Sequence, residues 1–124
     1  MRFLLLLILI FISINNAMAQ FAQKRQVLIF GPLQSQQVTR QLTLLEQDAA
    51  GVRERDMHIT LAAKEPQLYK KHNVEPSDTF TLILLGKDRG EKYRSTKLTA
   101  AQELFDLIDA MPMRQSEMRR KKRQ

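Results

Sequence analysis

The sequence predicts an α/β protein, a three-layer sandwich in which helices flank a small mixed central sheet. Two short segments, 26–30 and 80–85, are apolar on both faces, as in strands that other elements cover on each side. Segments with helical periodicity lie between them and after them. The chain has 124 residues and no cysteine, so one packed core without disulfides must hold it.

The first half of the chain alternates strands and helices. After the first apolar segment, a polar helix is expected over 34–50, with one apolar stripe and with Gly51 as a left-handed C-cap. Segment 57–61 alternates apolar and polar residues, which is typical of a half-buried strand. A short helix is expected just after it, because Pro66 suits a first helical position.

The second half contains a hairpin and the clearest helix. FTLILL (80–85) is followed by the turn KDRG and by EKYR, a segment polar enough for the edge of a sheet. The last helix is expected to begin with a capping box between Thr99 and Gln102 and to end at Pro112. Helical connections allow the first three strands to be parallel, and the hairpin makes the fourth antiparallel. This is the thioredoxin-like arrangement.

The first nineteen residues have the layout of a secretory signal peptide. Arg2 precedes an apolar run over 3–14, and Ala17-Met18-Ala19 provides small residues before a cleavage site at Gln20. The run is shorter than the roughly 20 residues that span a bilayer. We expect a periplasmic or secreted protein whose mature chain has no transmembrane segment; an uncleaved anchor is the alternative.

Charge and composition limit the partners. The formal charge of +7 is concentrated near the C-terminus, so we expect a folded domain over 20–118 and a disordered basic tail over 119–124. An exported protein rarely meets nucleic acid, so the expected partner is an exported or envelope protein, or an anionic surface. The absence of cysteine excludes thiol peroxidase and disulfide chemistry. No cofactor or metal is expected.

Three segments are candidate sites. The first is an interaction surface, since methionines suit adaptable protein contacts, and it comprises Met111, Pro112, Met113, Arg114 and Met118. The second is a recognition loop at the hairpin tip, formed by Lys87, Asp88 and Arg89. The third is an anion site at a helix start, formed by Ser35, Gln36 and Gln37. Their structural alternatives are closure of the core, ordinary turn chemistry and a helix cap made by Ser35.

Two motifs together carry a resemblance to a known family. LILLGKDRGEKYRS and LTAAQELFDLIDAMPMRQSEM resemble the signature of a peroxiredoxin-related family of unknown function. That family occurs in short secreted bacterial proteins and in the C-terminal domain of animal sushi-repeat-containing extracellular proteins. The resemblance covers nearly all of 22–118 and implies a thioredoxin-like fold.

The resemblance does not bring the chemistry of the wider superfamily with it. Thioredoxin-like enzymes carry a reactive thiol just after the first strand, where this chain reads GPLQSQQ with Ser35. They also place a cis-proline immediately before the third strand, whereas the nearest candidate here, Pro76, lies four residues before Phe80. A serine hydroxyl cannot replace a thiolate in disulfide chemistry.

Three functions follow as hypotheses. The first is a non-catalytic domain that works by binding through the methionine segment and the tail. The second is a cysteine-independent enzyme that uses a pocket between GPLQSQQ and the loop before Phe80. The third is a protein that binds a polyanion or a lipid surface through the basic tail.

Overall fold

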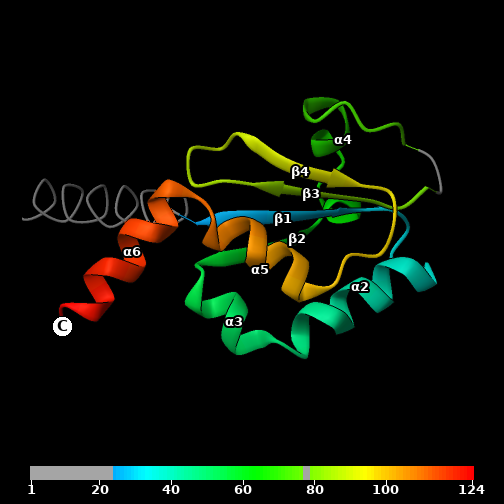
Figure 1. The fold of residues 1–124 in the computed structure, drawn as a ribbon. Helices are drawn as coiled ribbons and strands as arrows, with labels where there is room; N and C mark the ends of the chain where they lie inside the picture. Colours follow the sequence, from blue (N-terminus) through cyan, green and yellow to red (C-terminus); the bar gives the residue numbers. More distant parts are fainter. Residues whose placement is uncertain (1–23, 77–78) are drawn as a thin grey trace, which may run out of the picture.

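A four-stranded mixed sheet forms the middle layer of the protein (Figure 1). The computed structural model describes residues 24–76 and 79–124, so the predicted signal peptide lies outside the described residues. The strands are β1 (Arg25–Phe30), β2 (Met57–Leu61), β3 (Thr81–Leu85) and β4 (Glu91–Ser95). Their order in the sheet is β2-β1-β3-β4.

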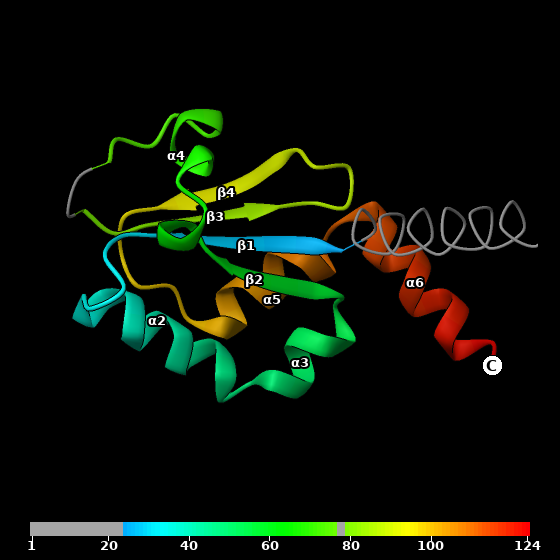
Figure 2. The same cartoon turned by 180° about the vertical axis from the view of Figure 1, so that it is seen from behind.

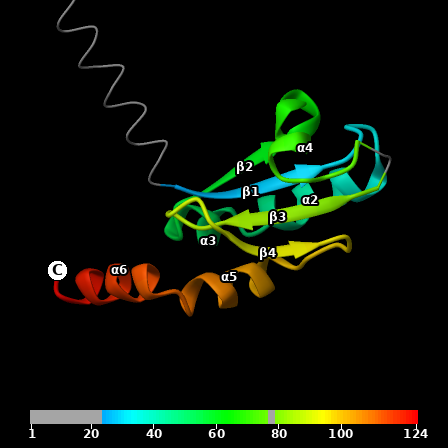
Figure 3. The ribbon, with the colours of Figure 1, turned by 90° about the horizontal axis from the view of Figure 1, so that it is seen from above.

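Helices cover both faces of the sheet (Figures 1 and 2). One face carries α2 (Gln36–Glu46), α3 (Ala49–Glu54) and α5 (Ala101–Asp109), and the other carries the 3-10 helix η1 (Ala62–Lys64) and α4 (Gln67–Lys71). A further helix, α6 (Pro112–Lys122), extends beyond one end of the sheet (Figure 3). The predicted three-layer, thioredoxin-like α/β architecture is therefore confirmed. No described helix is both long and apolar enough to cross a membrane.

The direction of β3 differs from the expectation. β1 and β2 are parallel, with Arg25 opposite Met57, but β3 runs antiparallel to β1, with Gln26 opposite Leu85. The five residues of α4 span about 7.5 Å, whereas β3 is about 16 Å long. The connection from β2 to β3 therefore leaves the chain at the end of the sheet where β2 finishes. β3 begins at that end and runs in the opposite direction to β1.

The core has two parts, one on each side of the sheet. Val27 and Ile29 of β1 pack with residues of α2, α3 and α5, while Leu28 and Phe30 pack under α4. Every residue of β3 is buried. This explains why 26–30 and 80–85 are apolar on both faces, since helices remove both faces from water.

Two local predictions in the helical layer are wrong. Gly51 lies inside α3, and the left-handed residue that leads into β2 is Asp56, with φ of 51°. The N-cap of α5 is Ala100, and it makes no side-chain cap bond. Instead, the Thr99 N–H donates to Gln41 Oε1 at 2.8 Å, and the Thr99 carbonyl accepts from Gln41 Nε2 at 2.9 Å. This long-range pair replaces the capping box.

The C-terminal tail is helical, contrary to the expectation of disorder. Pro112 not only follows the end of α5 but occupies the first turn of α6, where its missing N–H costs nothing. The helix then continues to Lys122 through Gln, Glu, Met, Arg and Lys, which are good helix formers. The expected boundary at residue 118 therefore falls inside a helix.

Candidate functional site

A network of charged side chains joins α6 to the body of the protein. We call it the charged network; its members come from β1, α3, the β3–β4 hairpin, α5 and α6. They are Arg25, Glu54, Arg55, Asp56, Lys87, Asp109, Arg114 and Glu117. Residues up to 92 positions apart in the sequence meet here.

Arg114 is at the centre of the charged network. Its side chain is 3% exposed, and its Nε donates to Asp109 Oδ1 at 3.1 Å. Its two Nη atoms donate to the Glu54 carbonyl at 3.3 Å and to Glu54 Oε1 at 3.2 Å. Arg114 thus holds α6 against α3 and α5. Because its side chain is buried, the open part of the contact surface expected from the sequence lies at Pro112 and Met113.

A second pair of cations holds the middle of α6. Arg25, 1% exposed, donates to the Arg55 carbonyl at 2.9 Å and to both Glu117 oxygens at 3.4 Å. Lys87 lies 2.6 Å from Glu117 Oε1 and 2.9 Å from Asp56 Oδ2. The hairpin is therefore tied to α6 and to the turn before β2.

The two carboxylates that receive most of these bonds stay ionised at neutral pH. The Arg55 guanidinium, bonded at 2.9 and 3.0 Å, lowers the pKa of Asp109; partial burial opposes this effect and Arg114 adds to it. Burial alone would raise the pKa of Glu117, but its bonds to Lys87 and Arg25 outweigh that effect and lower it. Both groups therefore attract the surrounding cations under ordinary conditions.

The methionine segment is divided between core and solvent. Met111 packs against the core, and Met118 is half-buried. Pro112 is exposed, and Met113 is one of the large apolar side chains most open to water, at 52%. Met111 thus helps to close the core, whereas Met113 and Pro112 are available for contact.

The hairpin tip and the first helix start contain the local bonds of their structural alternatives, and their roles as a recognition loop and an anion site stay predictions. Asp88 accepts from the Gly90 N–H and from Lys92, both at 2.9 Å, and Arg89 takes a left-handed conformation, as tight turns require. The Ser35 Oγ accepts from the Val38 N–H at 3.1 Å and so caps α2. Gln36 and Gln37 are exposed beside it.

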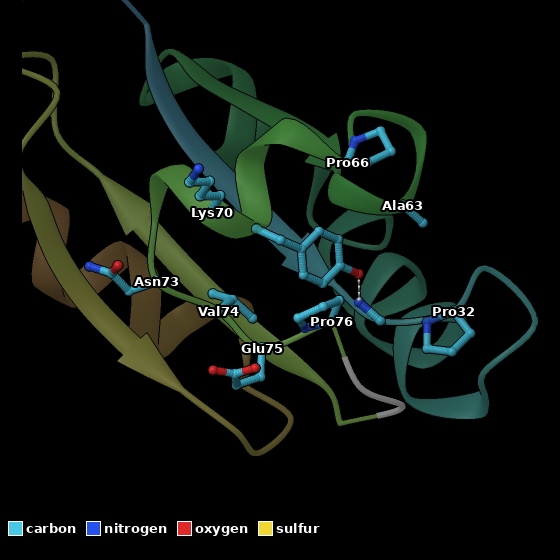
Figure 4. Close-up of a pocket in the computed structure, with 10 residues that line it drawn as sticks. Pro32, Ala63, Pro66, Lys70, Asn73, Val74, Glu75 and Pro76 are labelled. Carbon is cyan, nitrogen blue, oxygen red and sulfur yellow. Dashed lines mark hydrogen bonds between the residues drawn. The ribbon is translucent and has the colours of Figure 1, made fainter.

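A cleft of about 730 Å³ lies at the carboxyl ends of β1 and β2 (Figure 4). The chain leaves β1 towards α2 and leaves β2 towards α4, on opposite faces of the sheet, and ligands of open α/β sheets bind at such divergence points. Tyr69 forms part of the cleft, and its hydroxyl accepts from the Gly31 N–H at 3.0 Å. The cleft lies where the sequence led us to expect a pocket.

The composition of this cleft is poor in reactive groups. Among the described residues, its polar side chains belong to Tyr69, Lys70, Asn73 and Glu75, and the lining contains no Ser, Thr, Cys or His. In the described part of the chain no peptide bond is cis, Pro76 included, and no cluster of acidic, His or Cys side chains could hold a metal ion.

The sequence reasoning missed Arg25 and Glu117. A signal for Arg25 was present, because it alternates with Val27 and Ile29 and therefore faces the same core. A cation at such a position requires a buried counter-ion. The chain provides it 92 residues later, at a distance that no local pattern reveals.

Comparisons with known proteins support the fold and leave the activity open. The model of a family described as a domain of unknown function, DUF4174, matches residues 60–117, from β2 to the middle of α6. No curated protein matches the chain. A solved structure titled "Structure of a malarial protein" is 23% identical, with a TM-score of 0.55, and the match covers 69% of this chain and 94% of that one. At this identity the similarity concerns the fold alone.

Proposed function

We propose that this protein is an exported, non-catalytic binding module that uses the end of α6 to bind an anionic surface. One observation carries the proposal: a charged network with two buried arginines fixes the first turns of α6, and the last turns carry cations only. Arg114 and Arg25 are 3% and 1% exposed, whereas the five residues from Arg119 to Arg123 are all exposed. Export is supported by the signal-peptide pattern of the first nineteen residues.

The cations at the end of α6 are available to an outside partner. In the described part of the chain, none of the five forms an ion pair, and Arg119 bonds only to the Ser116 hydroxyl at 3.1 Å. A helix held in one place loses less conformational entropy on binding than a disordered tail would lose. Each Lys or Arg near an anionic membrane adds about 1 kcal/mol.

The experiment measures binding of the full chain to vesicles with and without an anionic lipid. We expect binding to phosphatidylglycerol vesicles that weakens with added salt, and little binding to phosphatidylcholine vesicles. Replacement of the five residues 119–123 by glutamine, a good helix former, removes about 5 kcal/mol and should weaken binding by more than about a thousandfold. Equal binding by the glutamine variant would refute the proposal.

A matched control keeps the charge and changes the side chains. Replacing the three arginines of this segment by lysine preserves all five positive charges. If the partner is an anionic surface, this variant should bind as the parent does, because the effect depends on charge. A loss of binding similar to that of the glutamine variant would indicate recognition of specific arginine geometry instead.

The alternative of a cysteine-independent enzyme in the cleft has less support. Acid–base chemistry there would depend on Tyr69, Lys70 and Glu75, and the Tyr69 hydroxyl already accepts from the Gly31 N–H at 3.0 Å. The preformed, largely apolar walls are better suited to holding a ligand.

A further inference from the structure

A second hollow lies between the β3–β4 hairpin and the junction of α5 and α6. Its volume is about 490 Å³, within the range of roughly 300–1,000 Å³ that is common for small-molecule sites. We call it the junction hollow. One wall is formed by the consecutive apolar residues 110–113 together with Leu107, and the opposite side by the hairpin and the start of β1.

The apolar wall is unusually open to water. Leu107 is 37% exposed and Met113 is 52% exposed, and they are two of only four large apolar side chains with such exposure in the described part of the chain. The other two, Leu33 and Leu98, do not line this hollow. A concave surface with adjacent exposed apolar side chains favours an apolar ligand.

The polar side of the junction hollow contains an unsatisfied donor. Arg25 lines the hollow and is 1% exposed. Its Nη atoms are bonded to Glu117 and to the Arg55 carbonyl, but its Nε has no partner. It is the one buried side-chain polar atom without a hydrogen bond in the described part of the chain. A buried donor of this kind is costly, and an acceptor that reached it would remove the cost.

The charges around the hollow favour an anion. Arg25, Lys87 and Lys92 line it, and Asp88 is the one acidic side chain in the lining. Asp88 is bonded to Lys92 at 2.9 Å, which leaves the other donors of that ammonium free for a second acceptor. A carboxylate near Arg25 would therefore meet three cations, of which Arg25 and Lys87 are also paired with Glu117 and Lys92 with Asp88.

We propose that the junction hollow binds the carboxylate of a fatty acid, with the acyl chain along Leu107 and Met113. The wall formed by Leu107 and residues 110–113 offers flexible thioether and aliphatic side chains, which adapt to an alkyl chain. It offers no polar side chain to pair with the amide groups of a peptide. The site uses none of the cations over 119–123, so it does not depend on the proposed surface binding.

The test uses decanoate and two ligands with the same chain and different headgroups. Decanoate added to the full chain below its micelle concentration should shift the NMR signals of the Met111 and Met113 methyl groups and of the Arg25 Nε–H, and the shifts should saturate. Decanol and decyltrimethylammonium should bind about tenfold more weakly, because neither carries a negative charge to pair with the cations of the hollow. Equal binding of all three ligands would refute recognition of a carboxylate.

A peptide with a free C-terminal leucine tests the alternative source of a carboxylate. If the free peptide bound more tightly than decanoate, and its C-terminal amide did not, the occupant would be a chain terminus and the fatty acid assignment would be wrong. Absence of any saturable shift with decanoate would also overturn the proposal.

Two matched leucine variants locate the site. Leu107 and Leu98 are equally exposed, at 37%, so Leu107→Asp and Leu98→Asp should disturb folding to a similar extent. We expect Leu107→Asp to weaken decanoate binding about tenfold through lost apolar contact and charge repulsion, and Leu98→Asp to leave it unchanged. The glutamine variant of residues 119–123 should bind decanoate normally. Unchanged binding by Leu107→Asp would refute the location.

Discussion

Substitution of Arg114 tests whether the charged network holds α6 in place. Arg114→Ala removes a side chain that is 3% exposed and that bonds to Asp109, to the Glu54 carboxylate and to the Glu54 carbonyl. Asp109 keeps its two bonds to Arg55, and Glu117 keeps its contacts with Arg25 and Lys87. After Arg114→Ala, the carboxylates of Asp109 and Glu117 therefore lose only part of their charged partners.

The expected loss of stability is about 2 kcal/mol. Breaking a fully buried ion pair costs about 3–5 kcal/mol, because one charge is left uncompensated. Glu54 is 48% exposed and Asp109 is 32% exposed, so water can replace part of what Arg114 provided, and the loss lies below that range. For a domain of this size, about 2 kcal/mol corresponds to a fall in Tm of roughly 8–16 °C.

The measurement is chemical and thermal unfolding of the full chain, followed by circular dichroism. Arg119→Ala is the control, because Arg119 lies on the same helix, is exposed and bonds only to Ser116. It should change stability by less than about 0.5 kcal/mol. If Arg114→Ala were as stable as Arg119→Ala, the buried bonds would contribute nothing and the network would not be what positions α6.

Two further predictions concern the same layer of helices. Because the folded-state pKa of Glu117 is lowered, its contribution to stability is fully present above its unfolded-state pKa of about 4.3 and is lost progressively as the pH falls through the folded-state pKa. Glu117→Gln should therefore cost about 1–2 kcal/mol at pH 7 and less at pH 3, measured by urea unfolding, and an equal cost at both pH values would contradict this. Gly51→Ala should destabilise the protein by about 1–2 kcal/mol, although alanine favours helices, because the new Cβ would lie 2.6 Å from the Phe105 ring. Phe105→Leu in the same chain should reduce that cost, and a stabilising Gly51→Ala would show that the ring moves freely.

The layers of the fold could be predicted from the sequence because they depend on local periodicity. Segments apolar on both faces indicated β1 and β3, and the amphipathic pattern indicated α2 and α5. The direction of β3 could not be derived in the same way, because it depends on how far the short α4 carries the chain. The extension of α6 was missed because Pro112 was interpreted as the end of a helix, although proline is equally suited to a helix start.

The candidate sites were harder to predict because their residues meet only after folding. The cleft after β1 was expected from the order of strands and helices, and the Ser35 cap followed from its position before a helix. Arg114 looked like a surface residue since arginine is usually exposed, and nothing near it in the sequence indicated that Glu54 would reach it. Because Arg114 is buried and bonded, we interpret it as a residue that holds α6 in place and not as a contact residue.

This reassignment changes which parts of the C-terminal segment are open to a partner. An arginine that holds a helix against the body cannot also leave it to bind another molecule without loss of stability. The exposed features that remain on either side of it are Met113, beside the junction hollow, and the cations of the last turns. The charged network thus lies between Met113 and the cations of the last turns, and its members Arg25 and Lys87 also line the junction hollow. Variants at Met113 or at residues 119–123 should consequently affect binding with little change in folding, whereas variants at Arg114 or Arg25 should affect folding first.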